Sequence, residues 1–174
     1  MNLSNTTQSF VLETERLRLR QFHLGDSPFI IELLNSPGWL EFIGDRNVKT
    51  KEQAENYLKN GPMKSYEQNG FGLSMVETRD GVSIGMCGIL RRDTLEHPDL
   101  GFAFLPEYIS KGYGFEIGSA VLTYAKNDLK FSTILAITLP ANTKSIKLLE
   151  KIGFTFVKNF RADSTSEELL LYSA

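Results

Sequence analysis

Apolar and polar residues follow two different spacings along this chain. Leucines alternate with arginines over residues 15–22, which is typical of a strand with one buried face. Apolar residues at helical spacing follow Asp26, a capping residue with a proline two positions later. They also follow Thr50, which forms a capping box with Gln53. The expected bounds are 15–22 for the strand, 26–36 and 50–60 for two helices, and a loop through Trp39 and Asp45 between those helices.

The second half of the chain favours strands and then alternates between helices and strands. Asp80-Gly81 separates two alternating runs and is a hairpin signal, because this pair tolerates positive φ. Asn142 is a helix cap, and Gly153 stops the same helix. The nearly continuous apolar run at 99–105 predicts a central strand. The expected strands are 71–77, 82–90, 99–105, 133–138, 154–160 and 168–172, with helices over 114–127 and 142–152.

This order of elements predicts a mixed α/β fold, whose sheet is antiparallel early and contains a crossover later. Residues 1–9 lack any periodicity and are expected to form a flexible tail. Residues 10–174 contain neither a repeat nor a linker, so we expect a single domain.

Composition excludes several classes of function. The chain has 174 residues, with 19 basic and 21 acidic side chains and no basic run, so nucleic-acid binding is not indicated. No apolar run approaches the ~20 residues of a membrane span, and the polar N-terminus is unlike a signal peptide. One cysteine, Cys87, and two histidines give neither a disulfide nor a zinc set, so no metal is expected. We therefore expect a cytoplasmic protein without a membrane partner, either a monomer or a homodimer.

The segment Ser110-Lys-Gly-Tyr-Gly114 carries the strongest chemical signal. It lies between a predicted strand and a predicted helix, where successive backbone N–H groups and the helix dipole can bind a phosphate. Glycines keep Cβ atoms away from those amides, although a simple tight turn explains a lone Gly-x-Gly equally well. A Walker A string is absent, and a dinucleotide fingerprint would need a third glycine where Ile117 stands.

Three stretches together resemble one known family. The run Asp99-Leu-Gly-Phe-Ala-Phe-Leu-Pro-Glu-Tyr-Ile-Ser-Lys-Gly-Tyr-Gly-Phe-Glu116 resembles the acetyl-CoA-binding motif of the GNAT superfamily of N-acetyltransferases. The stretch from Asn142 to Phe154 resembles that superfamily's second signature, a helix beside the pantetheine arm. The opening strand around 13–22 is similar to that of the ribosomal-protein alanine N-acetyltransferases. The resemblance covers about residues 12–160, in the expected order.

The resemblance implies a fold, a donor and a set of cofactor contacts. The fold would be a central mixed sheet, mostly antiparallel, flanked by helices. The donor would be acetyl-CoA. Ile109 departs from the usual Arg or Gln of the loop, and Leu149 departs from a tyrosine that many members use as an acid. The cofactor contacts implied are Phe104, Leu105, Lys111, Gly112, Tyr113, Gly114, Phe115, Asn142 and Ser145.

The resemblance also implies catalytic and acceptor roles. A backbone N–H near Phe104 or Leu105 would stabilise the developing oxyanion. Asp99 would act as base, its alternative being a surface carboxylate, while Glu41, Glu96 and His97 are weaker choices. Ser145 would contact the sulfur or the pantetheine, its alternative being an ordinary first-turn residue. Trp39 and Glu41 would wall the acceptor site, and core packing explains the neighbouring Phe42 as well.

These roles predict an enzyme that transfers an acetyl group to a primary amine by direct attack on the thioester. The acceptor would be a protein N-terminus or a small amine. The alternative is a sensor that binds an acyl-CoA in the same fold without catalysis.

Overall fold

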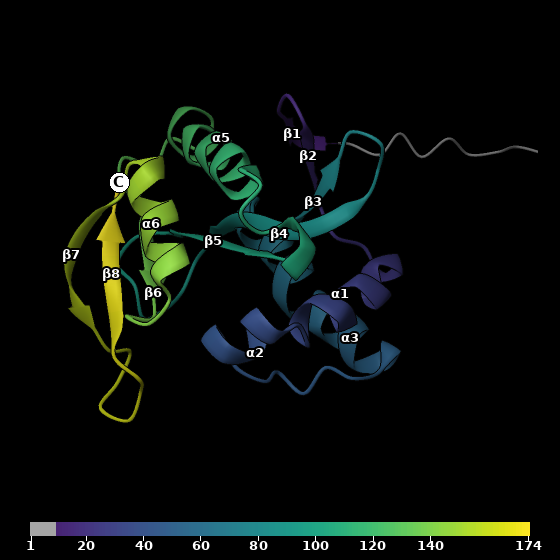
Figure 1. Cartoon of the computed structure of the whole chain (residues 1–174), viewed down its shortest axis with the longest axis horizontal. Coiled ribbons are helices and arrows are strands. Elements are labelled where there is room, and N and C mark those ends of the chain that lie inside the picture. Colours follow the sequence, from purple (N-terminus) through teal and green to yellow (C-terminus); the bar gives the residue numbers. More distant parts are fainter. Residues whose placement is uncertain (1–9) are drawn as a thin grey trace, which may run out of the picture.

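The computed structural model describes residues 10–174 and contains one eight-stranded sheet (Figure 1). The tail predicted for residues 1–9 lies outside the described residues. The strand order is β1-β2-β3-β4-β5-β6-β8-β7, and only the contact between β5 and β6 is parallel. The strands are β1 (Phe10–Glu13), β2 (Leu17–Arg20), β3 (Leu73–Thr78), β4 (Ser83–Leu90), β5 (Asp99–Phe104), β6 (Leu135–Thr138), β7 (Thr155–Phe160) and β8 (Leu169–Ser173).

Helices cover both faces of the sheet and define two cores (Figure 1). One core packs α5 and α6 against the sheet and includes Leu100 and Ile117. The other packs α1 and α3 against the opposite face and includes Leu33 and Met75. The helices are α1 (Ser27–Leu34), α2 (Pro37–Phe42), α3 (Lys51–Leu58), α4 (Lys64–Asn69), α5 (Tyr113–Asn127) and α6 (Thr143–Ile152), with short turns η1 (Leu24–Asp26), η2 (Lys59–Met63) and η3 (Pro106–Tyr108).

The predicted mixed α/β class is confirmed, as is most of the predicted element order. The apolar strand at 99–105 is indeed central, because β5 lies between β4 and β6. The hairpin forms at Asp80-Gly81, where Gly81 has a φ of +87°. Asn142 caps α6 through its side chain, and Gly153 follows the helix with a φ of +120°.

Two helix predictions were wrong. The connection through Trp39 is not all loop, because α2 forms there with Pro37 in its first turn and Trp39 buried. Six residues are too few for a periodic pattern to be recognised. The helix after Thr50 does not stop at 60–62 either, because η2 is a π-helical turn that holds Pro62 and leads into α4. A wider turn accommodates a proline, which lacks the N–H for the usual helical bond.

One strand was also missed. β1 pairs antiparallel with β2 and lies at the edge of the sheet. Its four residues, Phe10–Glu13, precede the alternating run that gave the signal for β2. The turn between these strands brings residues 14–16 to the end of the sheet where α5 begins, as the contacts of Arg16 with Glu116 demonstrate.

Candidate active site

The parallel strands β5 and β6 separate directly after one ladder pair (Figure 1). That pair joins Asp99 to Leu135, and within residues 10–174 these two strands form no other. β5 continues to Phe104 and β6 to Thr138, so the remainder of both strands borders a V-shaped opening. Asp99 therefore lies at the vertex of the V.

The backbone of β5 presents amide groups to this opening. On the β4 side, the N–H of Leu105 donates to the carbonyl of Ile84 at 3.0 Å. N–H groups alternate between the two edges of a strand, so the N–H of Phe104 is directed at the opening. Of the two amides that the sequence placed near the reacting carbonyl, that of Leu105 is already used inside the sheet, whereas that of Phe104 is not directed at β4.

The open end of the V meets the loop that precedes α5. Two residues of this loop have left-handed backbone conformations, Ser110 with φ +64° and Gly112 with φ +83°. α5 has no side-chain cap, and its first helical bond runs from the N–H of Glu116 to the carbonyl of Gly112. The amides of residues 113–115 precede that bond and are the unpaired donors of a helix N-terminus. A group of this kind binds phosphate.

The two glycines of the loop are needed for different reasons. Gly112 has positive φ, and a Cβ there would also lie 3.2 Å from Nη2 of Arg16. Gly114 faces α6 instead, because its Cβ would lie 2.8 Å from Cδ2 of Leu148. The glycine that keeps the helix end clear for a ligand is therefore Gly112, while Gly114 allows α5 to pack closely against α6.

α6 packs against α5 through Leu148 and Ile152, and the N-terminus of α6 contains the next two predicted residues. Oδ1 of Asn142 accepts the backbone N–H of Ser145 at 3.2 Å, so the capping role of Asn142 is confirmed. A cofactor contact of Asn142 and a role for the half-buried Ser145 hydroxyl stay predictions. Leu149, which stands at the position of the missing tyrosine, is 1% exposed and belongs to the core.

Asp99 is a buried carboxyl group rather than a surface one. It is 1% exposed, and Nε of Arg92 lies 3.1 and 3.0 Å from its two oxygens. Burial raises the pKa of Asp99 to about 6, although the charge and hydrogen bond of Arg92 oppose the rise. A carboxylate with this pKa can accept a proton near neutral pH. Sequence analysis missed Arg92, because nothing in a polar loop marks one arginine as its partner.

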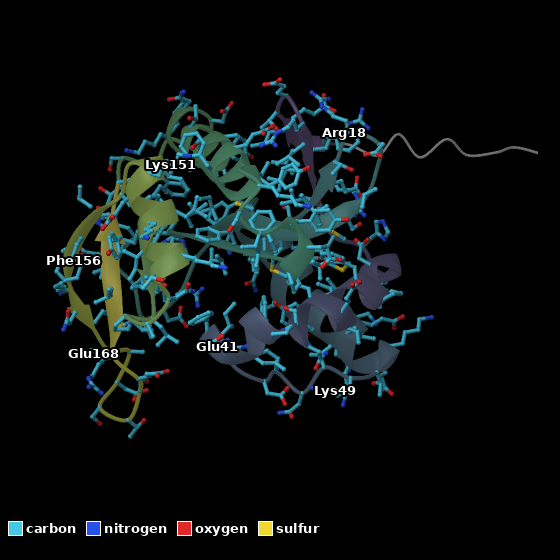
Figure 2. The ribbon with its side chains drawn as sticks, viewed as in Figure 1. Arg18, Glu41, Lys49, Lys151, Phe156 and Glu168 are labelled. Atoms are coloured by element: carbon cyan, nitrogen blue, oxygen red, sulfur yellow. The ribbon has the colours of Figure 1, made fainter. Side chains whose placement is uncertain are left out.

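Trp39 and Glu41 both lie on α2 but differ in environment. Trp39 is 7% exposed, and its Nε1 has no hydrogen-bond partner within the described residues. Glu41 is exposed, and Figure 2 shows it on the side of α2 nearer β6 and α6. The two residues are therefore a buried donor and a free carboxylate on the same short helix.

The other predicted loop residues combine positive charge and aromatic rings. Nζ of Lys111 lies 5.6 Å from the ring centroid of Tyr108. Nζ of Lys151, labelled in Figure 2, lies 4.5 Å from the ring centroid of Phe115. Tyr113 is half-buried beside Arg16, an arginine that sequence analysis did not connect with the loop. Arg16, Lys111 and Lys151 are therefore cations packed against aromatic rings of the loop and of the first turns of α5.

The described part of the chain shows neither a metal cluster nor a membrane helix. Across residues 10–174, no three His, Cys, Asp or Glu side chains lie together as a set of ligands. No helix within the same residues has both the length and the apolar character to cross a bilayer.

Comparisons with known proteins identify the family. Residues 16–155 match the model of the acetyltransferase (GNAT) domain. The uncharacterized N-acetyltransferase YoaA of Bacillus subtilis (strain 168) is 27% identical over 147 residues, which cover 83% of this chain and 82% of the relative. Because the family model matches most of its length, the chain belongs to the GNAT acetyltransferase family and is an N-acetyltransferase.

Solved structures agree with this assignment. An acetyltransferase of Agrobacterium tumefaciens strain C58 superposes with a TM-score of 0.79 at 25% identity, over 94% of this chain and 92% of the other. An α-N-protein acetyltransferase of ribosomal protein L7/L12, solved in complex with coenzyme A, superposes with a TM-score of 0.81. That match has 11% identity and covers 95% of this chain and 97% of the other, so it shows the fold alone.

Proposed function

We propose that this enzyme transfers the acetyl group of acetyl-CoA to a primary amine by direct attack on the thioester. The observation that carries the proposal is the separation of β5 from β6 after one pair, next to the uncapped N-terminus of α5. A long, thin ligand with a phosphate at one end fits this combination. The phosphate belongs at the helix end, and the arm belongs in the V.

The residues at the open end suit the donor's phosphates. The amides of residues 113–115 would bind the pyrophosphate, with the helix dipole favouring its charge. Lys111 adds a cation, whereas Ile109 adds no polar group. The amide groups of the pantetheine arm would pair with the free edge of β5, much as an added strand pairs with a sheet. Asn142 and Ser145, at the start of α6, are proposed to contact the arm.

The chemistry requires stabilisation of one developing charge. As the amine nitrogen bonds to the thioester carbon, the carbonyl oxygen becomes negative. The N–H of Phe104, directed at the opening, is the proposed donor to that oxygen, and one such donor contributes roughly 2.7–4 kcal/mol. The C–S bond then breaks, and the thiolate leaves with the electron pair.

Proton transfer is assigned to Asp99, and stabilisation of the leaving thiolate to Ser145. The attacking amine must be uncharged, and a free α-amine, with a pKa of about 7.7–8.0, needs less help than a lysine. Asp99 lies five residues before Phe104 on the same strand, roughly 16 Å away at ~3.3 Å per residue, so it would accept the proton of the amine through a chain of waters. The Ser145 hydroxyl would donate a hydrogen bond to the departing thiolate, which is stable enough to leave without a strong acid.

The acceptor is proposed to bind against α2. The buried Nε1 of Trp39 can donate to an acceptor carbonyl, and the exposed carboxylate of Glu41 attracts an ammonium group. A peptide N-terminus offers both groups, and a small amine offers the second alone. The fold shared with the L7/L12 acetyltransferase is consistent with a protein N-terminus in the cytoplasm, as expected for the ribosomal-protein branch.

Two measurements test the function together. Calorimetry with coenzyme A should detect binding, and release of free thiol should accompany turnover with N-terminal peptides or small amines. A panel that pairs each peptide with its N-terminally blocked form separates α-amine transfer from side-chain transfer. Tight binding without turnover on any acceptor would favour the sensor. Failure to bind coenzyme A would overturn the proposal.

A further inference from the structure

The carboxylate of Glu116 is held by the turn between β1 and β2, about a hundred residues earlier in the sequence. Its Oε1 accepts the hydroxyl of Thr14 at 2.7 Å and the backbone N–H of Arg16 at 2.8 Å. Its Oε2 accepts Nε–H of Arg16 at 2.6 Å. Glu116 lies in the first turn of α5, so these bonds tie the start of that helix to the turn between the edge strands β1 and β2.

The same arginine also contacts the loop itself. Nη1 of Arg16 donates to the carbonyl of Lys111 at 3.1 Å, and its guanidinium lies 4.5 Å from the ring centroid of Tyr113. Nη2 stands beside Gly112, 3.2 Å from the place of a Cβ. A guanidinium has five N–H donors in a rigid fork, and here two of them hold groups on opposite sides of Gly112.

This loop needs an external constraint for two reasons. Ser110 is not a glycine, yet it has positive φ, a conformation that persists only where the surroundings hold it. In addition, Glu116 carries a negative charge next to a helix end that has to accept a phosphate. Paired with Arg16 and Thr14, this carboxylate is compensated and turned toward β1 and β2.

We propose that Arg16 is a positioning residue of the CoA-phosphate site. Its side chain holds residues 110–113 in their binding conformation and neutralises the charge of Glu116. The inference rests on the proposed function, since it concerns the binding of the same donor. It predicts that a substitution of Arg16 weakens binding of the phosphate-bearing part of the donor and leaves the rate of the acyl-transfer step unchanged.

The test compares Arg16→Gln with the wild type in calorimetric binding of coenzyme A. We expect Kd to rise about tenfold, the loss typical of a charge-assisted hydrogen bond. The KM for acetyl-CoA should rise in parallel, whereas the KM for acetyl-pantetheine, which lacks phosphates, and kcat for both donors should stay unchanged. General damage to the fold would impair both donors equally, and that result would overturn the proposal.

Arg18→Gln is the matched control. Arg18 lies two residues further along, on β2 (Figure 2), pairs with Glu13 at 2.9 Å and lies 4.9 Å from the ring centroid of Phe10. The substitution removes the same charge from a similar environment away from the loop, so the Kd for coenzyme A should change less than twofold. An equal loss in Arg16→Gln and Arg18→Gln would also overturn the proposal.

Arg16→Lys covers the case in which Arg16→Gln does not fold. Lysine keeps the charge but lacks the fork, so we expect a severalfold rise in Kd. A wild-type Kd in folded Arg16→Lys, or in folded Arg16→Gln, would contradict the assignment. Wild-type protein that binds no coenzyme A would instead refute the proposed function, so the two failures are distinguishable.

Discussion

Gly112 meets two requirements of the proposed phosphate loop, a left-handed backbone and the absence of a side chain beside the amides of α5. Its φ of +83° excludes most side chains, and it immediately precedes the free amides of α5. A side chain at this position would therefore change both the backbone and the charge that a phosphate meets.

Gly112→Asp should weaken coenzyme A binding by at least about 1.4 kcal/mol, a factor of ten in Kd, because it adds a negative charge beside the phosphate. Gly112→Asn is the matched variant, since asparagine has the same shape and tolerates left-handed backbone. Calorimetry on both variants isolates the charge. Equal affinity of folded Gly112→Asp and the wild type would contradict the location of the site.

If Asp99 is the base, its protonation should appear in the pH dependence of kcat/KM. Its pKa is raised to about 6 by burial, against the influence of Arg92, so the base form is lost as pH falls through 6. An α-amine acceptor loses its uncharged form below about pH 7.7–8.0. The slope of log kcat/KM against pH should therefore be one between these values and two below pH 6.

Asp99→Asn should remove the second step of that profile and lower kcat by about 10²–10⁴-fold, the usual contribution of a general base. Binding of coenzyme A should be unchanged, which calorimetry checks. A variant that retains the steep limb below pH 6 would show that another group is the base.

At the scale of elements, the backbones of β4 and of the segment before β3 approach each other closely, and β4 in turn pairs with β5, which borders the opening. A Cβ on Gly88 of β4 would lie 2.2 Å from the carbonyl oxygen of Gly72, a backbone atom that cannot move away without moving the start of β3. By contrast, a Cβ on Gly38 of α2 would meet nothing within 4 Å.

Gly88→Ala should therefore lower the free energy of unfolding by about 1–3 kcal/mol, as overpacking usually does. Gly38→Ala is the control and should raise it by about 0.4–1 kcal/mol, because alanine restricts the unfolded chain. Urea denaturation of both variants measures the difference. Equal stability of Gly88→Ala and the wild type would indicate that β3 shifts freely.

The elements that could be predicted from the sequence are those bounded by local signals, such as capping residues and glycine stops. Asn142 and Gly153 bound α6 by their own chemistry, so its predicted end at Ile152 was correct and its predicted start differed by one residue. α2 and the π-helical turn at Pro62 were missed, because packing of Trp39 and a widened turn override local preference. The glycine-containing loop before α5 was predictable from local signals, but the contact of Arg16 was not, since no local pattern joins Arg16 to Glu116.

At the scale of the whole molecule, the V divides the sheet. β1–β5 lie on one side and β6, β8 and β7 on the other, with Asp99 and Leu135 as the one ladder pair between them in the described chain. The packing of α5 on α6 adds a second connection. Within the described residues, both connections leave the N–H groups of Phe102 and Phe104, which are directed at the opening, without a partner strand.

Coenzyme A should therefore protect the amides of Phe102 and Phe104 and those of residues 113–115 from hydrogen exchange. The pantetheine arm would occupy the first group and the pyrophosphate the second. Exchange measured by mass spectrometry with and without coenzyme A tests this, with the hairpin turn at 79–82 as an internal control. Protection confined to 113–115 would show that the arm does not pair with β5.

Because β5 and β6 share a single pair within residues 10–174, the stability of the protein should depend on the concentration of its donor. A ligand that binds only the folded state stabilises it by about 2.7 kcal/mol at a hundredfold excess over Kd. Here the donor would bridge two parts of the sheet that share a hydrophobic core but only one ladder pair within the described residues. Resistance to proteolysis should accordingly rise and fall with the supply of acetyl-CoA, so that the enzyme lasts longest when its donor is abundant.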